Sequence, residues 1–96
     1  MDEVKILGLT YAIERVPVVS RDDKLWGRID YEDLTIKIDA NMSEKRQAHT
    51  IAHEAIHGIL GALGFREENE NETLVQSLST ALCQCVTDNP GLFMIS

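Results

Sequence analysis

The pentapeptide HEAIH places His53 and His57 four residues apart, with Glu54 directly after the first histidine. On an α-helix such a pair lies on one face, so both imidazoles can reach one tetrahedral Zn²⁺ at about 2.0–2.1 Å. Glu54 projects about 100° away around the axis, where it can hold a water molecule instead of the metal. Zinc lowers the pKa of such a water toward about 7, and a carboxylate can accept its proton. The spacing predicts His53 and His57 as zinc ligands and Glu54 as general base.

The same pentapeptide also fits a simpler interpretation, a pair of histidines at the edge of a buried helix face. When His53 is set at 0°, the apolar residues of this segment cover an arc of about 160° to 340°. His57 then falls at about 40°, beside His53 at the border of that arc. This position, between the core and the solvent, favours a zinc site.

A catalytic zinc site takes a third protein ligand and keeps one position open. Four acids follow within the segment REENENE, namely Glu67, Glu68, Glu70 and Glu72. Glu72 borders the apolar face of the next predicted helix, so packing the two apolar faces together could bring it to the metal. The sequence favours Glu72, followed by Glu70. The alternative is that all four are solvated acids in a charged connection.

Other polar residues near the motif have less specific roles. His49 lies eight residues before His57, which corresponds to about 12 Å along a straight helix and is too far for one zinc ion to bridge. We therefore expect His49 at the edge of the core or beside a ligand. Thr50 or Asp39 could orient a ligating imidazole. Tyr31 and Arg28 are candidates for stabilising an oxyanion.

The HEAIH motif lies in the strongest predicted helix, from about residue 44 to 63, which follows capping residues and ends before Gly64. Residues 34–39 alternate between apolar and polar and predict a half-buried strand, paired in a hairpin with residues 25–30. Residues 4–19 predict one further strand. These elements indicate an α+β fold with a small three-stranded antiparallel sheet.

The segment after the motif helix predicts a second main helix. Residues 66–72 are acidic and predict a solvated loop, and the helix itself runs from about residue 71 to 87. Cys83 and Cys85 point about 200° apart on it, so we expect two reduced thiols. One face of this helix is apolar and is expected to pack on the motif helix, with Leu74, Val75, Leu78, Ala81, Leu82, Cys85 and Val86.

Composition limits the classes of partner. The 96 residues fit one domain, and 44% hydrophobic with 26% charged residues is typical of a soluble globular protein. A formal net charge of −7 argues against direct nucleic-acid binding, which needs clustered cations. No apolar run approaches the roughly 20 residues that span a bilayer, and no signal peptide is indicated. We expect an intracellular protein without membrane contact.

The order of strand, hairpin, HEAIH helix, acidic turn and Glu-led helix resembles the ImmA/IrrE-like zinc metallopeptidases, particularly the short forms of phages and mobile elements. The resemblance covers roughly residues 34–90 and rests on HEAIHGIL and NETLVQSLSTAL. It implies a minimal zincin-like domain over residues 1–96, with Glu72 as third ligand. It also implies that the strand of residues 34–38 could pair with an extended peptide by β-augmentation.

Together these observations predict a zinc-dependent metallopeptidase that hydrolyses a peptide bond in a protein substrate. Some members of the family it resembles cleave a repressor, so a regulatory protein in the cytoplasm of a bacterial host cell is one expected substrate. The alternative is a non-catalytic zinc-binding module that binds a host protein. Glu54 favours the enzyme, because a structural zinc site needs no general base. A metal-free helical adaptor is a third interpretation.

Overall fold

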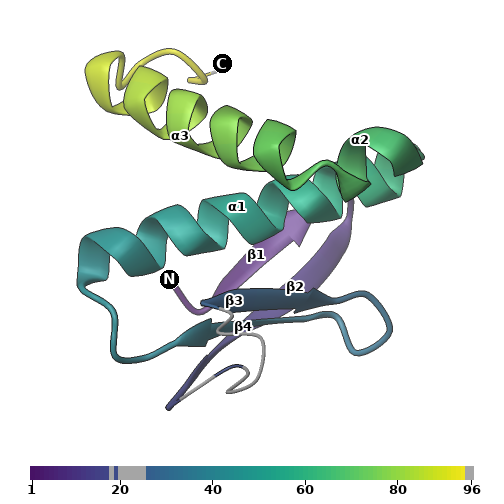
Figure 1. Ribbon diagram of the computed structural model, residues 1–96. Coiled ribbons are helices and arrows are strands. Elements are labelled where there is room, and N and C mark those ends of the chain that lie inside the picture. Colours follow the sequence, from purple (N-terminus) through teal and green to yellow (C-terminus); the bar gives the residue numbers. More distant parts are fainter. Residues whose placement is uncertain (18, 20–25, 95–96) are drawn as a thin grey trace.

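The computed structural model describes residues 1–17, 19 and 26–94 of the chain. These residues form an α+β fold, as predicted (Figure 1). No helix among them is long and apolar enough to cross a membrane. The elements are β1 (Glu3–Ile6), β2 (Leu9–Val16), β3 (Gly27–Asp30), β4 (Thr35–Asp39), α1 (Glu44–Leu63), α2 (Arg66–Glu70) and α3 (Glu72–Asp88).

The sheet is mixed and four-stranded, which corrects the predicted three-stranded antiparallel sheet. Its order is β1-β2-β4-β3, with β2 and β4 parallel and the two outer pairs antiparallel. The predicted strand of residues 4–19 is in fact a hairpin that reverses at Leu7 and Gly8, whose φ angles are +47° and +89°. Two positive φ values are typical of a type I′ turn, which matches the twist of paired strands. Gly8 is therefore a turn residue.

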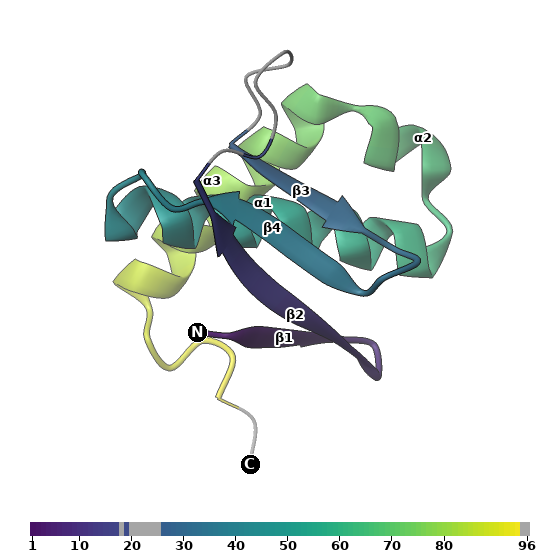
Figure 2. The same cartoon turned by 90° about the horizontal axis from the view of Figure 1, so that it is seen from below.

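The predicted hairpin before the motif helix is confirmed by β3 and β4, where Ile29 pairs with Ile36. Leu25, the expected start of its first strand, lies outside the described residues, as do residues 18 and 20–24. β4 is bonded to β2 on one side and to β3 on the other, so it cannot receive an added peptide strand. The expectation of β-augmentation at residues 34–38 is therefore wrong. The two edge strands are β1 and β3, as Figure 2 shows, and β3 is the one next to β4.

Helix α1 covers one face of the sheet and has the predicted bounds. The side chain of Ser43 accepts a hydrogen bond from the backbone N–H of Arg46, which caps the first turn, and Gly64 ends the helix in the left-handed conformation. Alternating residues of β4 are fully buried beneath α1. The core consists of Ile6, Tyr11, Ile13, Ile36, Ile38, Met42 and Ile51.

The segment predicted as a solvated loop contains the short helix α2, so that prediction is wrong. Glu and Arg have high helix propensity, and acids at the start of a helix interact favourably with its dipole. Asn71 then caps α3, because its side chain accepts a hydrogen bond from the backbone N–H of Leu74 at 3.0 Å. The cap fixes Glu72 as the first residue of α3.

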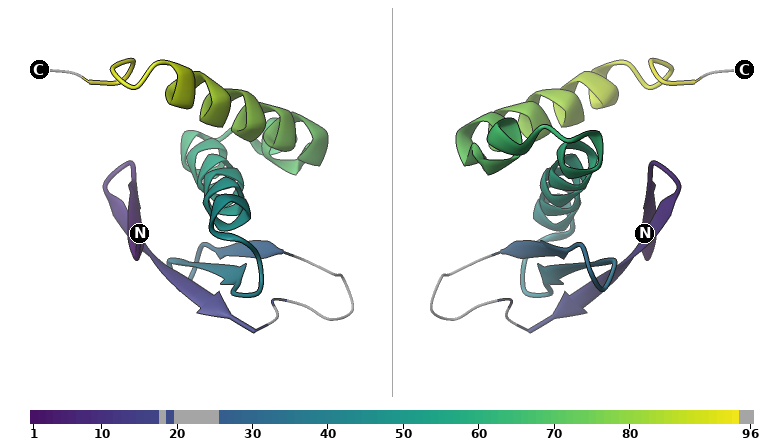
Figure 3. Two further views of the ribbon diagram at one scale, coloured as in Figure 1. Left: turned by 90° about the vertical axis from the view of Figure 1, so that its left-hand side faces the viewer. Right: turned by 90° about the vertical axis from the view of Figure 1, so that its right-hand side faces the viewer.

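Helix α3 lies across α1 on the side away from the sheet (Figure 3). Only Val75 and Ser79 of α3 are buried. The predicted apolar face is therefore covered only near its start, whereas Leu82 and Val86 are each 42% exposed and Cys85 is exposed. Both cysteines are free thiols. The second half of α3 is therefore less covered than its start.

The unequal burial of β4 and α3 predicts unequal effects on stability. Ile36→Ala should lower the free energy of unfolding by about 2–5 kcal/mol, because it opens a cavity in the fully buried core. Leu82→Ala removes a similar side chain from a half-exposed position and should cost less than about 1 kcal/mol. Urea unfolding measures both values. Equal losses would contradict the described packing of α3.

Candidate metal centre

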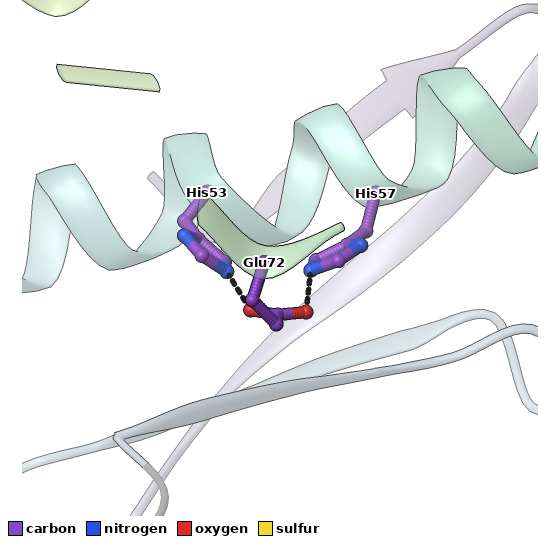
Figure 4. Close-up of side chains that lie close together, drawn as sticks. All are labelled: His53, His57 and Glu72. Carbon is purple, nitrogen blue, oxygen red and sulfur yellow. Dashed lines mark hydrogen bonds and ion pairs between the residues drawn. The ribbon is translucent and has the colours of Figure 1, made fainter. Parts of the chain in front are cut away.

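Helix α1 presents His53 and His57 one turn apart, with ring centroids separated by 5.0 Å. The start of α3 places Glu72 between them, as Figure 4 shows. One carboxylate oxygen lies 3.1 Å from Nε2 of His53, and the other lies 2.8 Å from Nε2 of His57. The imidazoles are largely buried, with 16% and 12% of their side-chain surfaces exposed. The structure thus brings together the three residues predicted as metal ligands.

One ligand atom from each of these residues lies within 4.8 Å of the others, close enough to bind one metal ion. Two ligand atoms about 2.1 Å from one tetrahedral ion are about 3.4 Å apart, close to the nitrogen–oxygen distances observed here. This is the one such group within residues 1–17, 19 and 26–94. The competing acids Glu67, Glu68 and Glu70 lie on α2, are exposed, and do not belong to it.

A chain of hydrogen bonds determines which nitrogen of His57 carries its proton. The hydroxyl of Tyr31 donates to the carbonyl oxygen of His57 at 3.0 Å, so its oxygen is left to accept from the side-chain N–H of Asn69 at 3.1 Å. The Asn69 carbonyl oxygen therefore faces Nδ1 of His57, 2.7 Å away. Since that oxygen can only accept, Nδ1 is the donor. In the neutral imidazole, the lone pair is then on Nε2.

The same arrangement holds for His53. The side-chain oxygen of Gln76 lies 2.9 Å from Nδ1 of His53, and the Gln76 N–H group donates to the hydroxyl of Thr80 at 3.1 Å. The amide is thus oriented with its oxygen toward the ring. Nδ1 of His53 is the donor, and its Nε2 faces Glu72.

These hydrogen bonds orient the centre so that it could accept a cation or protons. In the neutral form, both imidazoles would direct their Nε2 lone pairs toward the Glu72 carboxylate, which also has only lone pairs to offer. Such an arrangement is unfavourable unless protons or a positive ion lie between the groups. The orientation of each ring by a hydrogen bond at Nδ1 is typical of metal-ligating histidines. The donor set therefore fits a metal ion bound by His53, His57 and Glu72.

Glu54 lies beside this group and is only 7% exposed. Burial raises the pKa of its carboxyl group above the ordinary value, and the negative charge of Glu72 adds to the rise. Positive charge on His53 and His57 and a backbone hydrogen bond from Ile29 act in the opposite direction. The carboxyl group is thus held in a position where its affinity for a proton exceeds that of an exposed glutamate.

The edge strand β3 approaches Glu54 closely because it has a glycine there. A Cβ atom on Gly27 would lie 2.5 Å from Cγ2 of Thr50 and 3.2 Å from Oε2 of Glu54. Any larger residue would push β3 away from α1 or displace the carboxylate. Gly27 therefore sets the distance between the sheet edge and the candidate centre.

Two cavities flank the centre along β3. One has a volume of about 460 Å³ and lies toward the first half of α1, and the other has a volume of about 290 Å³ and extends toward Tyr31. Gly27, His53, Glu54 and Glu72 line both. The cavities adjoin at these residues, and the two together are called the cleft below.

The other residues singled out in the sequence have different roles. His49 lines the larger cavity and lies outside the ligand group, as expected. Thr50 donates to the carbonyl of Arg46, and Asp39 accepts from the backbone of Asn41, so neither orients an imidazole. Arg28 lines the smaller cavity.

Sequence reasoning missed the two residues that do orient the rings, Asn69 and Gln76. A signal for Gln76 was present, because it follows Glu72 by four residues and so shares its helix face. Asn69 gave no comparable signal, since its segment was interpreted as a loop.

Comparison of the chain with family models, curated proteins and solved structures found no match. The interpretation of the centre therefore depends on its own geometry.

The close approach at Gly27 predicts a specific pattern of destabilisation and rescue. Gly27→Ala should lower the free energy of unfolding by about 1–3 kcal/mol, because the new methyl group overlaps the methyl group of Thr50. Thr50→Ser removes that methyl group and retains the hydroxyl, so the double variant should recover more than half of the loss. Thr50→Ser alone is the control. A double variant no more stable than Gly27→Ala would show that the contact does not limit the approach of β3.

The orienting bond at His57 predicts an effect on metal affinity. Asn69→Leu should weaken the affinity for Zn²⁺ by about 10–100-fold, because the ring loses the acceptor that holds its tautomer. Asn69→Asp retains an acceptor oxygen and should bind close to the wild-type level. Competition with a chromogenic chelator measures both affinities, and Tyr31→Phe tests the next bond in the chain. Equal affinities for the Leu and Asp variants would contradict the orienting role.

Proposed function

We propose that this protein is a zinc-dependent metallopeptidase of the ImmA/IrrE-like type, acting on a protein substrate in the cytoplasm of a bacterial host cell. The observation that carries the proposal is the buried carboxyl group of Glu54 beside three candidate metal ligands, in a cleft along the edge strand β3. Each part has a function in peptide hydrolysis.

Zinc is the metal that suits this centre best. Two imidazole nitrogens and one carboxylate oxygen form the ligand set of many hydrolytic zinc sites, which keep a fourth position for water or substrate. When bound, the ion would polarise the scissile carbonyl and make a water molecule reactive near neutral pH. His53, His57 and Glu72 would hold it, with Asn69 and Gln76 orienting the two rings.

Glu54 would act as the general base. It neighbours His53 in the chain but projects from a different side of α1, so it can accept a proton without competing for the metal. Its raised pKa suits this role, since a stronger base takes a proton more readily and can pass it to the leaving amine. A purely structural metal site has no need of such a group.

The substrate would bind as an extended segment along β3. An edge strand offers unpaired backbone groups to another chain, and the flanking cavities would receive side chains on both sides of the scissile bond. Arg28 lines the smaller cavity and is the candidate for stabilising an oxyanion. The hydroxyl of Tyr31 already donates to a backbone carbonyl and would have to exchange that bond to contribute.

The second candidate function is a non-catalytic zinc-binding module that recognises a host protein. It is supported by the exposed apolar residues on the second half of α3, which could contact a partner. A non-catalytic module does not explain why the carboxyl group of Glu54 is buried beside the candidate ligands. The two candidates differ in what the Glu54 carboxylate contributes.

Replacement of Glu54 separates these functions. In Glu54→Gln, zinc content measured by mass spectrometry should stay near one ion per chain, while peptide hydrolysis should fall by a factor of about 10²–10⁴, because the proton acceptor is lost. His53→Ala should lose both. Cleavage is followed by mass spectrometry on a peptide library. Absence of zinc from the reconstituted wild type would exclude the peptidase, and unchanged cleavage in Glu54→Gln would exclude the assigned base.

A further inference from the structure

The larger cavity differs from the rest of the protein in its charge. Beyond the candidate centre it is lined by Lys45, Arg46 and His49 on α1 and by Trp26 next to β3. The chain as a whole has a formal net charge of −7. Two of its nine lysines and arginines thus lie at one end of a single cleft, in an otherwise acidic protein.

The two cations have no carboxylate partner in the described part of the chain. The ion pairs found there join Arg15 to Asp2 and the two imidazoles to Glu72, and none includes Lys45 or Arg46. The first turn of α1 adds the positive end of its dipole. The acid of that turn, Glu44, does not line the cavity. This end of the cleft therefore presents positive charge to a ligand.

Arg46 is positioned for binding by an aromatic contact. Its guanidinium carbon lies 5.1 Å from the centroid of the Trp26 ring, within the range of a cation–π interaction. Such a contact restricts a long side chain, so less conformational entropy is lost when the guanidinium binds a carboxylate. Trp26 directly precedes β3, which places the contact at the start of the edge strand.

The spacing along α1 relates these cations to the candidate centre. Arg46 precedes His53 by seven residues, or about 10 Å along the helix axis. An extended peptide advances about 3.3 Å per residue, so it would cover this distance in about three residues. His49 lies about 6 Å before His53 along the helix axis, a distance that an extended peptide covers in about two residues.

We infer that the cleft selects acidic peptides, with Lys45 and Arg46 binding a carboxylate about three residues from the scissile bond. The inference deepens the proposed function and rests on it, since it takes the cleft to hold a peptide. A single-stranded nucleic acid is the other polyanion to consider. Two cations in a chain of net charge −7 supply little of the charge that phosphate binding needs, whereas the adjoining edge strand suits a polypeptide.

The test measures peptide binding in zinc-reconstituted Glu54→Gln, where cleavage is blocked. The probes are three fluorescent synthetic peptides that share one uncharged central sequence. Glutamates flank this sequence on both sides in the first peptide, glutamines in the second and lysines in the third. Fluorescence anisotropy should show the glutamate peptide binding about tenfold more tightly than the glutamine peptide. The added substitutions Lys45→Gln and Arg46→Gln should reduce this preference to less than about twofold.

The matched control is Lys5→Gln with Arg66→Gln, which removes one exposed lysine and one exposed arginine elsewhere. It should retain the full preference. Equal binding of the glutamate and glutamine peptides, binding of neither, or a preference that survives in the Lys45/Arg46 variant would overturn the inference. So would tighter binding of single-stranded oligothymidine through the same two residues.

Cleavage by the wild type separates this inference from the function on which it rests. Equal cleavage of the glutamate and glutamine peptides would leave the peptidase standing and overturn the acidic preference. Charge-selective binding through Lys45 and Arg46, without zinc or cleavage, would support the acidic ligand and overturn the peptidase.

Discussion

The carboxylate of Glu72, held between the imidazoles of His53 and His57, is the interaction on which the arrangement of the helices depends. It joins the start of α3 to the middle of α1, where α3 buries only Val75 and Ser79. The hydrogen bonds at both Nδ1 atoms direct lone pairs toward that carboxylate. Protons or a positive ion between these groups would make the contact attractive, so a metal bound here would also favour the docking of α3.

Helix α1 contacts three neighbouring elements, and a different side of the helix faces each of them. One side packs on the sheet through residues such as Ile51, a second presents the imidazoles to α3, and a third presents Glu54 to the edge strand β3. The 100° step of the helix separates Glu54, the proposed base, from the candidate ligands. Under the proposed function, a base and a metal would therefore approach one substrate atom from different directions.

The cleft takes its form from contacts that are remote in the sequence. Gly27 lets β3 approach Glu54, and Tyr31, in the turn after β3, is linked to His57 through Asn69 of α2. The turn after β3 and helix α2 thus position His57, and β3 is an edge strand of the sheet. The charge is also unevenly distributed, because Lys45 and Arg46 gather at one end of an acidic molecule. The two ends of the cleft therefore differ in both volume and charge.

The sequence by itself determined the local structure: the α1 helix, the β3–β4 hairpin, and the pairing of His53 with His57. These depend on periodicity and spacing within a few residues, which the chain displays directly. It also favoured Glu72 among four acids, since only a residue at the border of an apolar helix face can turn toward a neighbouring helix.

Only the tertiary structure decided the parallel pairing of β2 with β4, which leaves β3 at one edge of the sheet, and the orienting roles of Asn69 and Gln76. It also left Leu82 and Val86 exposed, although their pattern predicted burial. Strand order and helix crossing are set by contacts between distant segments, and a pattern within one segment does not specify its neighbour.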